Sequence, residues 1–130
     1  MSLDECIHDT ADLVRAYSDQ AIDTLNLKIG RIGGISKSRV IRDLCVSLGI
    51  PVKVQDTSGE EFNAAATAHL AHSTPSRYLH SMWDCAGFVE RPIGTGLIRK
   101  AEERVRANSE PGFGVTPIME ELGDPVAVYE

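Results

Sequence analysis

The sequence predicts an α/β fold in which short strands alternate with amphipathic helices. Residues 24–29 alternate between apolar and polar side chains, as a half-buried strand does, and residues 36–48 repeat apolar side chains at the 3.6-residue spacing of a helix. The same order of strand and then helix recurs along the first 83 residues. Such an order implies a parallel sheet with right-handed crossovers, whose functional groups gather at the carboxyl ends of the strands.

The first two predicted elements are the end of a strand at residues 3–7 and a helix that runs through Leu13 and Tyr17. Either Asp9 or Thr10 would cap this helix, because both side chains can accept a hydrogen bond from a backbone N–H in the first turn. The next strand covers residues 24–29. Its apolar side chains are Leu25, Leu27 and Ile29, and its polar side chains, expected to line a barrel lumen, are Thr24, Asn26 and Lys28.

A glycine-rich turn over residues 30–34 is expected to lead into the second long helix, with Ser36 as its N-cap. Gly49, followed by Pro51, is the stop signal. The apolar positions of this helix are Val40, Ile41, Leu44, Cys45 and Leu48.

A third strand is predicted at residues 52–54, followed by a polar loop over 55–59 and an alanine-rich helix over 60–72. Residues 78–83 read as a fourth strand. After it the helical repeat stops, and residues 93–98 and 103–108 are expected to form a short turn with extended or weakly helical pieces. A Pro-Gly loop and a short helix near Met119 complete the chain.

Lys28 is the first candidate functional residue, because it stands at the carboxyl end of the second strand. An ammonium buried there loses hydration, so its pKa falls and it can exchange protons near neutral pH. The alternative is a strand-end lysine whose ammonium reaches solvent. Asp4, Asp56 and the pair Trp83-Asp84 end the other strands. This convergence favours an active site. In an open lumen, however, water is expected to leave the pKa of Lys28 near its ordinary value of about 10.4.

The segments Leu3-Asp4-Glu5, Asn26-Leu27-Lys28-Ile29-Gly30 and Gly49-Ile50-Pro51-Val52, with Gly33, Gly34 and Lys37, carry a family resemblance. They resemble the C-terminal half of the enolase superfamily, in the mandelate racemase and muconate lactonizing enzyme branch. The resemblance implies a partial TIM barrel, made of about the last four β-strands with their intervening helices, over residues 1–87. Residues 88–130 would then extend toward a capping domain.

The resemblance also implies roles for residues. Asp4 would bind Mg2+ in the complete enzyme, and Lys28 would be the catalytic acid/base, 24 residues further along. The reaction would begin with abstraction of the proton next to a substrate carboxylate, while Mg2+ holds that carboxylate. The outcome would be racemisation or epimerisation, cycloisomerisation, or dehydration.

Within that branch, the loop at residues 55–59 and the end of the chain are similar to the hydroxyproline dehydratase and proline-betaine epimerase group. The substrate would be a small carboxylate, such as an amino-acid or proline derivative. The residues implied in substrate binding are Asn26, Asp56, Ser58 and Trp83. Ser58 replaces a tryptophan that is usual in that group. Capping of the following helix is an equal alternative for Asp56, and a core position is favoured for Trp83.

The chain has 130 residues, whereas a complete barrel needs about 250, and a single carboxylate does not make a tight magnesium site. We therefore expect a fragment that is inactive alone and needs the missing N-terminal half. The alternative is a non-catalytic half-barrel remnant that only folds and oligomerises. Two open sheet edges and an uncovered apolar face would favour a homo-oligomer.

Composition limits the other classes of function. The net charge of -6 argues against binding to nucleic acid or to an anionic membrane, and no apolar run approaches transmembrane length, so a cytoplasmic protein is expected.

The three separated cysteines favour reduced thiols. Partly buried helix histidines are favoured over a metal site at His69 and His72. A phosphate site at the glycines of residues 30–34 ranks below the family resemblance, because neither dinucleotide nor P-loop spacing is present.

Overall fold

The computed structural model describes residues 1–130 except 58–59, 86–87, 97–98, 102–103 and 130. Its first part is a four-stranded parallel sheet in the order β1-β2-β3-β4, which confirms the predicted α/β class. The elements of this part are β1 (Ser2–Leu3), α1 (Thr10–Ser18), β2 (Thr24–Lys28), α2 (Ile29–Ile32), α3 (Ile35–Leu48), β3 (Val52–Gln55), α4 (Glu61–His72) and β4 (Leu79–Trp83).

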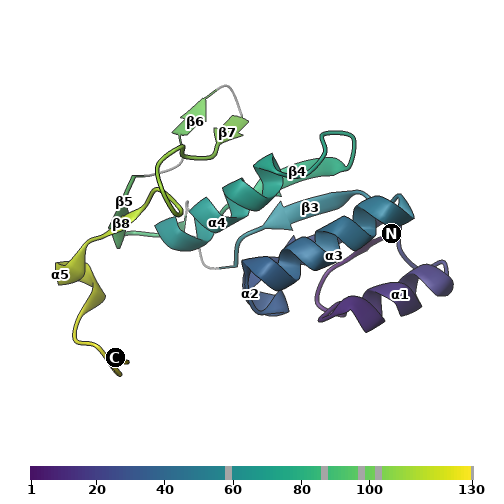
Figure 1. Ribbon diagram of the computed structural model, residues 1–130, viewed down its shortest axis with the longest axis horizontal. Helices are drawn as coiled ribbons and strands as arrows, with labels where there is room; N and C mark the ends of the chain where they lie inside the picture. Colours follow the sequence, from purple (N-terminus) through teal and green to yellow (C-terminus); the bar gives the residue numbers. More distant parts are fainter. Residues whose placement is uncertain (58–59, 86–87, 97–98, 102–103, 130) are drawn as a thin grey trace.

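One face of the sheet carries the hydrophobic core. The core side chains of β2 are Leu25 and Leu27, those of β3 are Val52 and Val54, and all four are fully buried. They pack in one cluster with apolar side chains of the helices, among them Ile41 of α3. The helices therefore lie together on one side of the sheet, as half of a barrel wall would (Figure 1).

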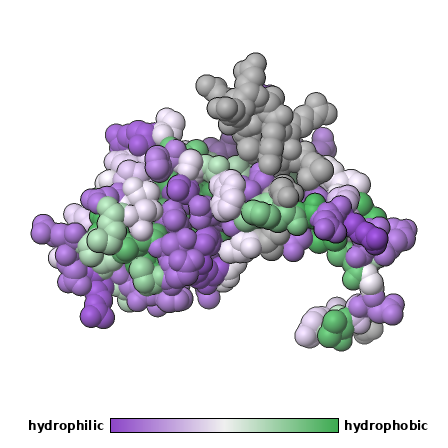
Figure 2. All heavy atoms as spheres, turned by 180° about the vertical axis from the view of Figure 1, so that it is seen from behind, coloured by the Kyte–Doolittle hydropathy of each residue, from purple (hydrophilic) through white to green (hydrophobic). Residues whose placement is uncertain are grey.

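The other face of the sheet is polar, which corrects the expectation of an uncovered apolar face. Strand alternation puts every second residue on this face. In register across the sheet, the side chains there are Asn26, Lys53 and Ser81 in one row and Lys28, Gln55 and Trp83 in the next. Figure 2 views the molecule from behind, and hydrophilic residues occupy the middle of that view.

The structure shortens the predicted first strand. A strand reaching residue 7 is wrong, because β1 ends at Leu3 and the backbone N–H of Ile7 donates to the carbonyl of Asp4 over 3.2 Å, closing a turn. Asp4 and Glu5 therefore lie in the loop that follows β1. Asp9 caps α1, as predicted, and its side chain accepts hydrogen bonds from the backbone of Ala11 and Asp12.

The turn expected at residues 30–34 contains the short helix α2, and Ser36 is not the cap of α3. That helix begins one residue earlier, with Gly34 in the N-cap position. The φ angle of Gly34 is 115°, in the region that favours glycine, so this backbone conformation decides the start of the helix. Val40 is 55% exposed, because it points outward beside the buried Ile41.

The last third of the chain forms small antiparallel pairs beside α4, in line with the extended pieces expected there. Its elements are β5 (Gly94–Thr95), β6 (Arg99–Ala101), β7 (Arg104–Arg106), β8 (Thr116–Pro117) and α5 (Met119–Leu122). Strand β5 pairs with β8, and β6 pairs with β7. The buried Glu61 of α4 accepts a hydrogen bond from the backbone N–H of Ile93, which holds this segment to the first part.

The end of the chain stands apart from the rest. Helix α5 and the residues after it project from the body of the molecule (Figure 1). Their large apolar side chains, Met119, Leu122, Val126, Val128 and Tyr129, are exposed. In the described part of the chain, no helix has the length and apolar character needed to cross a membrane.

Candidate active site at the carboxyl ends of the strands

The loop after β1 and the end of β2 bring four charged side chains together. The Nζ atom of Lys28 lies 2.9 Å from Oδ2 of Asp4 and 3.1 Å from Oε1 of Glu5. Arg31 reaches the same two carboxylates through Nη1 and Nη2. Two cations thus meet two carboxylates at the carboxyl ends of neighbouring parallel strands, where the chain topology predicts a functional site.

Asn26 also contacts this ionic cluster, which consists of Asp4, Glu5, Lys28 and Arg31. Its Nδ2 atom donates to Oδ2 of Asp4 over 3.4 Å, and its Oδ1 atom accepts from the hydroxyl of Ser2 over 3.2 Å. Because Asn26 and Lys28 lie two residues apart on one strand, both side chains reach the polar face. In this arrangement Asn26 orients the Asp4 carboxylate.

The cluster changes the proton affinities of its members. Burial by itself would raise the pKa of Asp4, but hydrogen bonds from Lys28, Arg31 and Asn26 outweigh it and lower that pKa. The hydrogen bond to Asp4 raises the pKa of Lys28, against an opposing effect of burial. The expectation of an ordinary pKa for Lys28 is therefore wrong. Its side chain is only 16% exposed, so water does not screen the Asp4 carboxylate from it.

Asp56 and Asp84 end the other two strands as buried carboxylates. The backbone N–H of Cys85 donates to Oδ2 of Asp56 over 3.4 Å, which ties the two strand ends together. Asp56 is not the N-cap of α4, because that position belongs to Glu60. Burial, followed by the nearby charges of Asp56 and Asp84, raises the pKa of the Cys85 thiol.

Trp83 is not a core residue. Its side chain is 50% exposed on β4, and the edge-to-face contact with the Phe88 ring, at 6.5 Å between centroids, leaves much of it in solvent. In the described chain, no strand pairs with the outer edge of β4. Ser58, implied in substrate binding, lies outside the described residues.

Two members of the cluster, Glu5 and Arg31, were missed by sequence reasoning. Arg31 stands three residues after Lys28, which in α2 is one helical turn, so its side chain returns toward the start of the helix. This three-residue spacing could have indicated that Arg31 lies near Lys28, but only if a helix had been predicted where the glycines indicated a turn. Glu5 directly follows Asp4, and only the turn after β1 brings both carboxylates to Lys28.

The described residues do not make a magnesium site by themselves. The Asp4 carboxylate has the hard oxygen atoms that Mg2+ prefers, but both oxygens already contact Lys28 and Arg31. Among the described residues, no three His, Cys, Asp or Glu side chains converge in a way that could hold a metal ion. His69 is half-buried and His72 is exposed on α4, where His69 stacks obliquely near Phe113.

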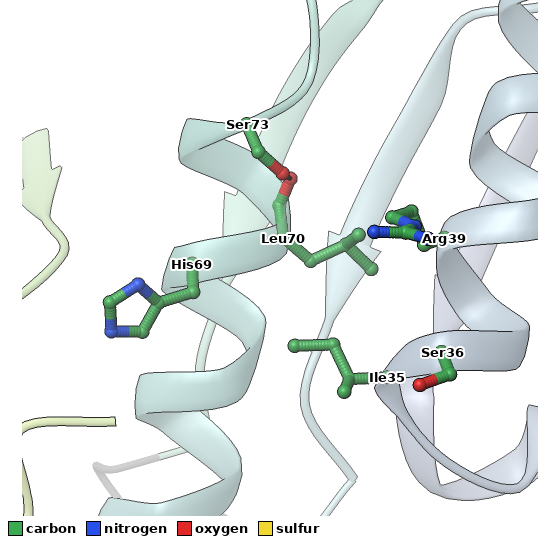
Figure 3. A pocket seen from close by; sticks show the side chains of 6 residues that line it. All are labelled: Ile35, Ser36, Arg39, His69, Leu70 and Ser73. Atoms are coloured by element: carbon green, nitrogen blue, oxygen red, sulfur yellow. Dashed lines mark hydrogen bonds between the residues drawn. The ribbon is translucent and has the colours of Figure 1, made fainter. Parts of the chain in front are cut away.

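A cavity of about 270 Å³ lies elsewhere, between α3 and α4. Figure 3 shows Leu70 of α4 and Arg39 of α3 extending toward one another across it, while His69 points away. Its lining residues are Ile35, Ser36, Arg39, His69, Leu70 and Ser73. No member of the ionic cluster lines this cavity, so the two features are separate.

Comparison with known proteins gives one consistent family. A family model described as enolase C-terminal domain-like matches residues 1–121. The cis-3-hydroxy-L-proline dehydratase of Roseibium aggregatum is 42% identical over 127 residues, which cover 98% of this chain and 35% of that protein. The o-succinylbenzoate synthase of Geobacillus kaustophilus is 29% identical over 86% of this chain and 30% of its own length.

Solved structures agree with these relatives. A mandelate racemase/muconate lactonizing enzyme from Roseovarius nubinhibens superimposes with a TM-score of 0.93 and 38% identity, over 98% of this chain and 34% of that one. A member of the enolase superfamily from the same organism, complexed with magnesium, has a TM-score of 0.92 and 35% identity over 99% of this chain and 35% of its own. The chain thus spans about a third of the length of the relatives that it matches.

Proposed function

The chain belongs to the enolase C-terminal domain-like family, and we propose that it is the C-terminal portion of a magnesium-dependent enzyme that removes the α-proton of a small carboxylate substrate. The observation that carries this proposal is the position of Lys28 at a strand end, 2.9 Å from Asp4 and inside the segment that the family model matches. Racemisation, epimerisation, cycloisomerisation and dehydration all share this first step.

In this proposal Lys28 takes or returns the proton, and Asp4 is one ligand of the magnesium ion. Magnesium, when bound in the complete enzyme, would hold the substrate carboxylate and stabilise the negative charge that develops on it. The magnesium complex of a similar enolase-superfamily structure supports the choice of ion. The other ligands would come from the part of the enzyme that this chain does not include, because Asp4 alone does not form the site.

The ion pair between Lys28 and Asp4 is a second reason to expect the chain alone to be inactive, beside its incomplete set of magnesium ligands. A lysine whose pKa is raised by a carboxylate stays protonated near neutral pH and cannot accept a proton. Lys28 would act as a base only if its pKa fell well below its ordinary value, which requires both the loss of the Asp4 contact and a nearby cation such as the magnesium ion. We therefore propose that assembly of the complete site releases Lys28 from this pair.

The proposed substrate is an amino-acid or proline derivative. The similar dehydratase is named for cis-3-hydroxy-L-proline, and two further relatives are named as an L-Ala-D/L-Glu epimerase and a hydrophobic dipeptide epimerase. Asn26, Asp56 and Trp83 would line the substrate site; the proposed role of Ser58 rests on the family resemblance alone, because Ser58 lies outside the described residues. We also propose that residues 1–87 form the barrel portion and residues 88–130 the extension toward a capping domain.

The second candidate function is a non-catalytic half-barrel that acts only through folding and assembly. One observation favours it: the two cations and the two carboxylates of the cluster pair with one another. The two functions differ in whether Lys28 exchanges protons with a substrate.

A chimaera tests the proposal. This chain would replace the matching 35% of the Roseibium aggregatum dehydratase, and proton NMR in D2O would follow exchange of the α-proton of cis-3-hydroxy-L-proline. Lys28→Met should lower the exchange rate by about two orders of magnitude or more, whereas Lys37→Met, at an exposed position of α3, should retain it. Near-normal exchange by the Lys28→Met chimaera would refute the role of Lys28. A folded wild-type chimaera without exchange would favour the non-catalytic function.

A further inference from the structure

Lys53 occupies an unusual position in the sheet. It lies in the middle of β3, with Asn26 of β2 and Ser81 of β4 as its register neighbours. The residues on either side of it, Val52 and Val54, are fully buried in the core on the opposite face. Lys53 therefore belongs to the polar face, as a cation between two neutral side chains.

No ion pair or side-chain hydrogen bond of Lys53 is found within the described part of the chain. The carboxylates of the ionic cluster are taken by Lys28 and Arg31. The Asp4 loop is also two strand spacings away, about 10 Å, because β2 separates β1 from β3. The half-buried ammonium of Lys53 thus depends on water at the uncovered face.

We propose that this polar face becomes the interior of the complete barrel, and that one of the strands completing it carries an Asp or Glu whose side chain pairs with Lys53 there. The inference rests on the proposed function and adds the chemistry of the partner. It is supported by the relatives, which superimpose closely on this chain but are about three times as long. Within the residues that the structure describes, the outer edges of β1 and β4 also have no paired strand.

A protein carboxylate fits this position better than the other possible occupants. Lys53 lies one row further from the carboxyl ends of the strands than Lys28, Gln55 and Trp83. A substrate that binds at the carboxyl ends therefore meets these three residues before Lys53. A second copy of the chain would place another Lys53 on the opposing face in a two-fold interface, and like charges oppose such pairing. The interior of a complete barrel is filled with layers of side chains, so the neighbour expected for Lys53 there is a protein side chain.

Closure of a barrel over this face would remove the Lys53 ammonium from water. A buried charge without a partner is strongly unfavourable, whereas a well-placed carboxylate offsets most of that cost. Removal of one member of such a pair leaves the other buried and unpaired. Lys53 should therefore matter for stability in the assembled protein and hardly at all in the isolated chain.

The test compares Lys53→Met in the chimaera described above and in this chain alone, by urea denaturation at neutral pH. We expect the midpoint of the chimaera to fall by about 1 M, while the midpoint of the isolated chain stays unchanged. Lys53→Arg, which keeps the charge, should restore most of the loss. Lys37→Met, on the outer surface of α3, should change neither protein.

Equal midpoint changes in the two proteins, or a chimaera that Lys53→Met leaves unchanged or makes more stable, would overturn the inference. A change in KM without a change in midpoint would assign Lys53 to the substrate and overturn it as well. These outcomes leave proton exchange by Lys28 intact, so they are distinguishable from failure of the proposed function. A wild-type chimaera that does not fold would count against both.

Discussion

Coupling between Lys28 and Asp4 is the most direct prediction of the site geometry. The perturbation is a double-mutant cycle with Lys28→Met and Asp4→Asn, two changes that remove charge and keep side-chain length. The atoms involved are 2.9 Å apart, and the two side chains are 16% and 22% exposed. Such a pair lies between the 0.2–1 kcal/mol of exposed ion pairs and the several kcal/mol of buried ones, so we expect a coupling free energy of about 1–2 kcal/mol.

The pH dependence of this coupling follows from the two pKa shifts. The pKa of Asp4 is lowered in the folded chain, so its contribution is present above the unfolded value of about 3.9 and is lost as pH falls through the folded value. The pKa of Lys28 is raised, so its contribution is present below about 10.4 and is lost as pH rises through the folded value. The coupling should therefore be constant across neutral pH and weaken toward both extremes.

The coupling is measured by urea denaturation of the wild-type chain, the two single variants and the double variant. Circular dichroism at several pH values monitors the unfolding. Arg31 still contacts Asp4 after Lys28→Met, so that single variant should lose less stability than Asp4→Asn, which leaves both cations with only Glu5. Single effects that add to within about 0.3 kcal/mol at neutral pH would refute the reasoning, because they would show that the two side chains do not interact in solution.

Three further predictions concern the fold. Asp9→Ala should lower the free energy of unfolding by about 1 kcal/mol, measured by thermal denaturation, because it removes the hydrogen bonds that cap α1; an unchanged value would contradict the cap. Gly34→Ala should cost about 1–2 kcal/mol, since alanine is strained at a φ of 115°, and a more stable variant would be the contrary result. Iodoacetamide should label the exposed Cys6 in the folded chain but reach Cys45 only after unfolding, because burial raises the pKa of Cys45 to about 12; equal labelling rates in mass spectrometry would disprove it.

The sequence predicted the parts of the site that depend on strand order. Asp4 follows β1 and Lys28 is the last residue of the neighbouring parallel strand β2, so their proximity is a consequence of topology, which the alternation of apolar side chains reveals. Arg31 was missed because α2 is a single turn that contains Gly30, and helix periodicity is not visible in four residues. The backbone at Gly34 also outweighed the capping preference of Ser36, since only the fold shows where a positive φ is required.

Exposure was harder to predict than secondary structure. Val40 and Ile41 are adjacent apolar residues of α3, and only the direction of the sheet decides which one is buried. Trp83 is exposed because its side chain lies on the uncovered polar face of an outer strand, and that position depends on the whole strand order rather than on the local sequence. The polar face is consistent with the alternation that puts Asn26 and Lys28 on one side of β2, and the expectation of an uncovered apolar face overlooked this pattern.

The short length of β1 has a consequence for local opening of the chain. Only Ser2 and Leu3 pair with β2, whereas β3 pairs with β2 over four residues. Few backbone hydrogen bonds hold β1, so this edge should open at a lower free energy than the middle of the sheet and show faster amide hydrogen exchange. The contacts of Lys28 and Arg31 then act as a tether that holds the Asp4 loop against β2. Neutralising those cations should lower the free energy of opening of β1 further below that of the core of the sheet.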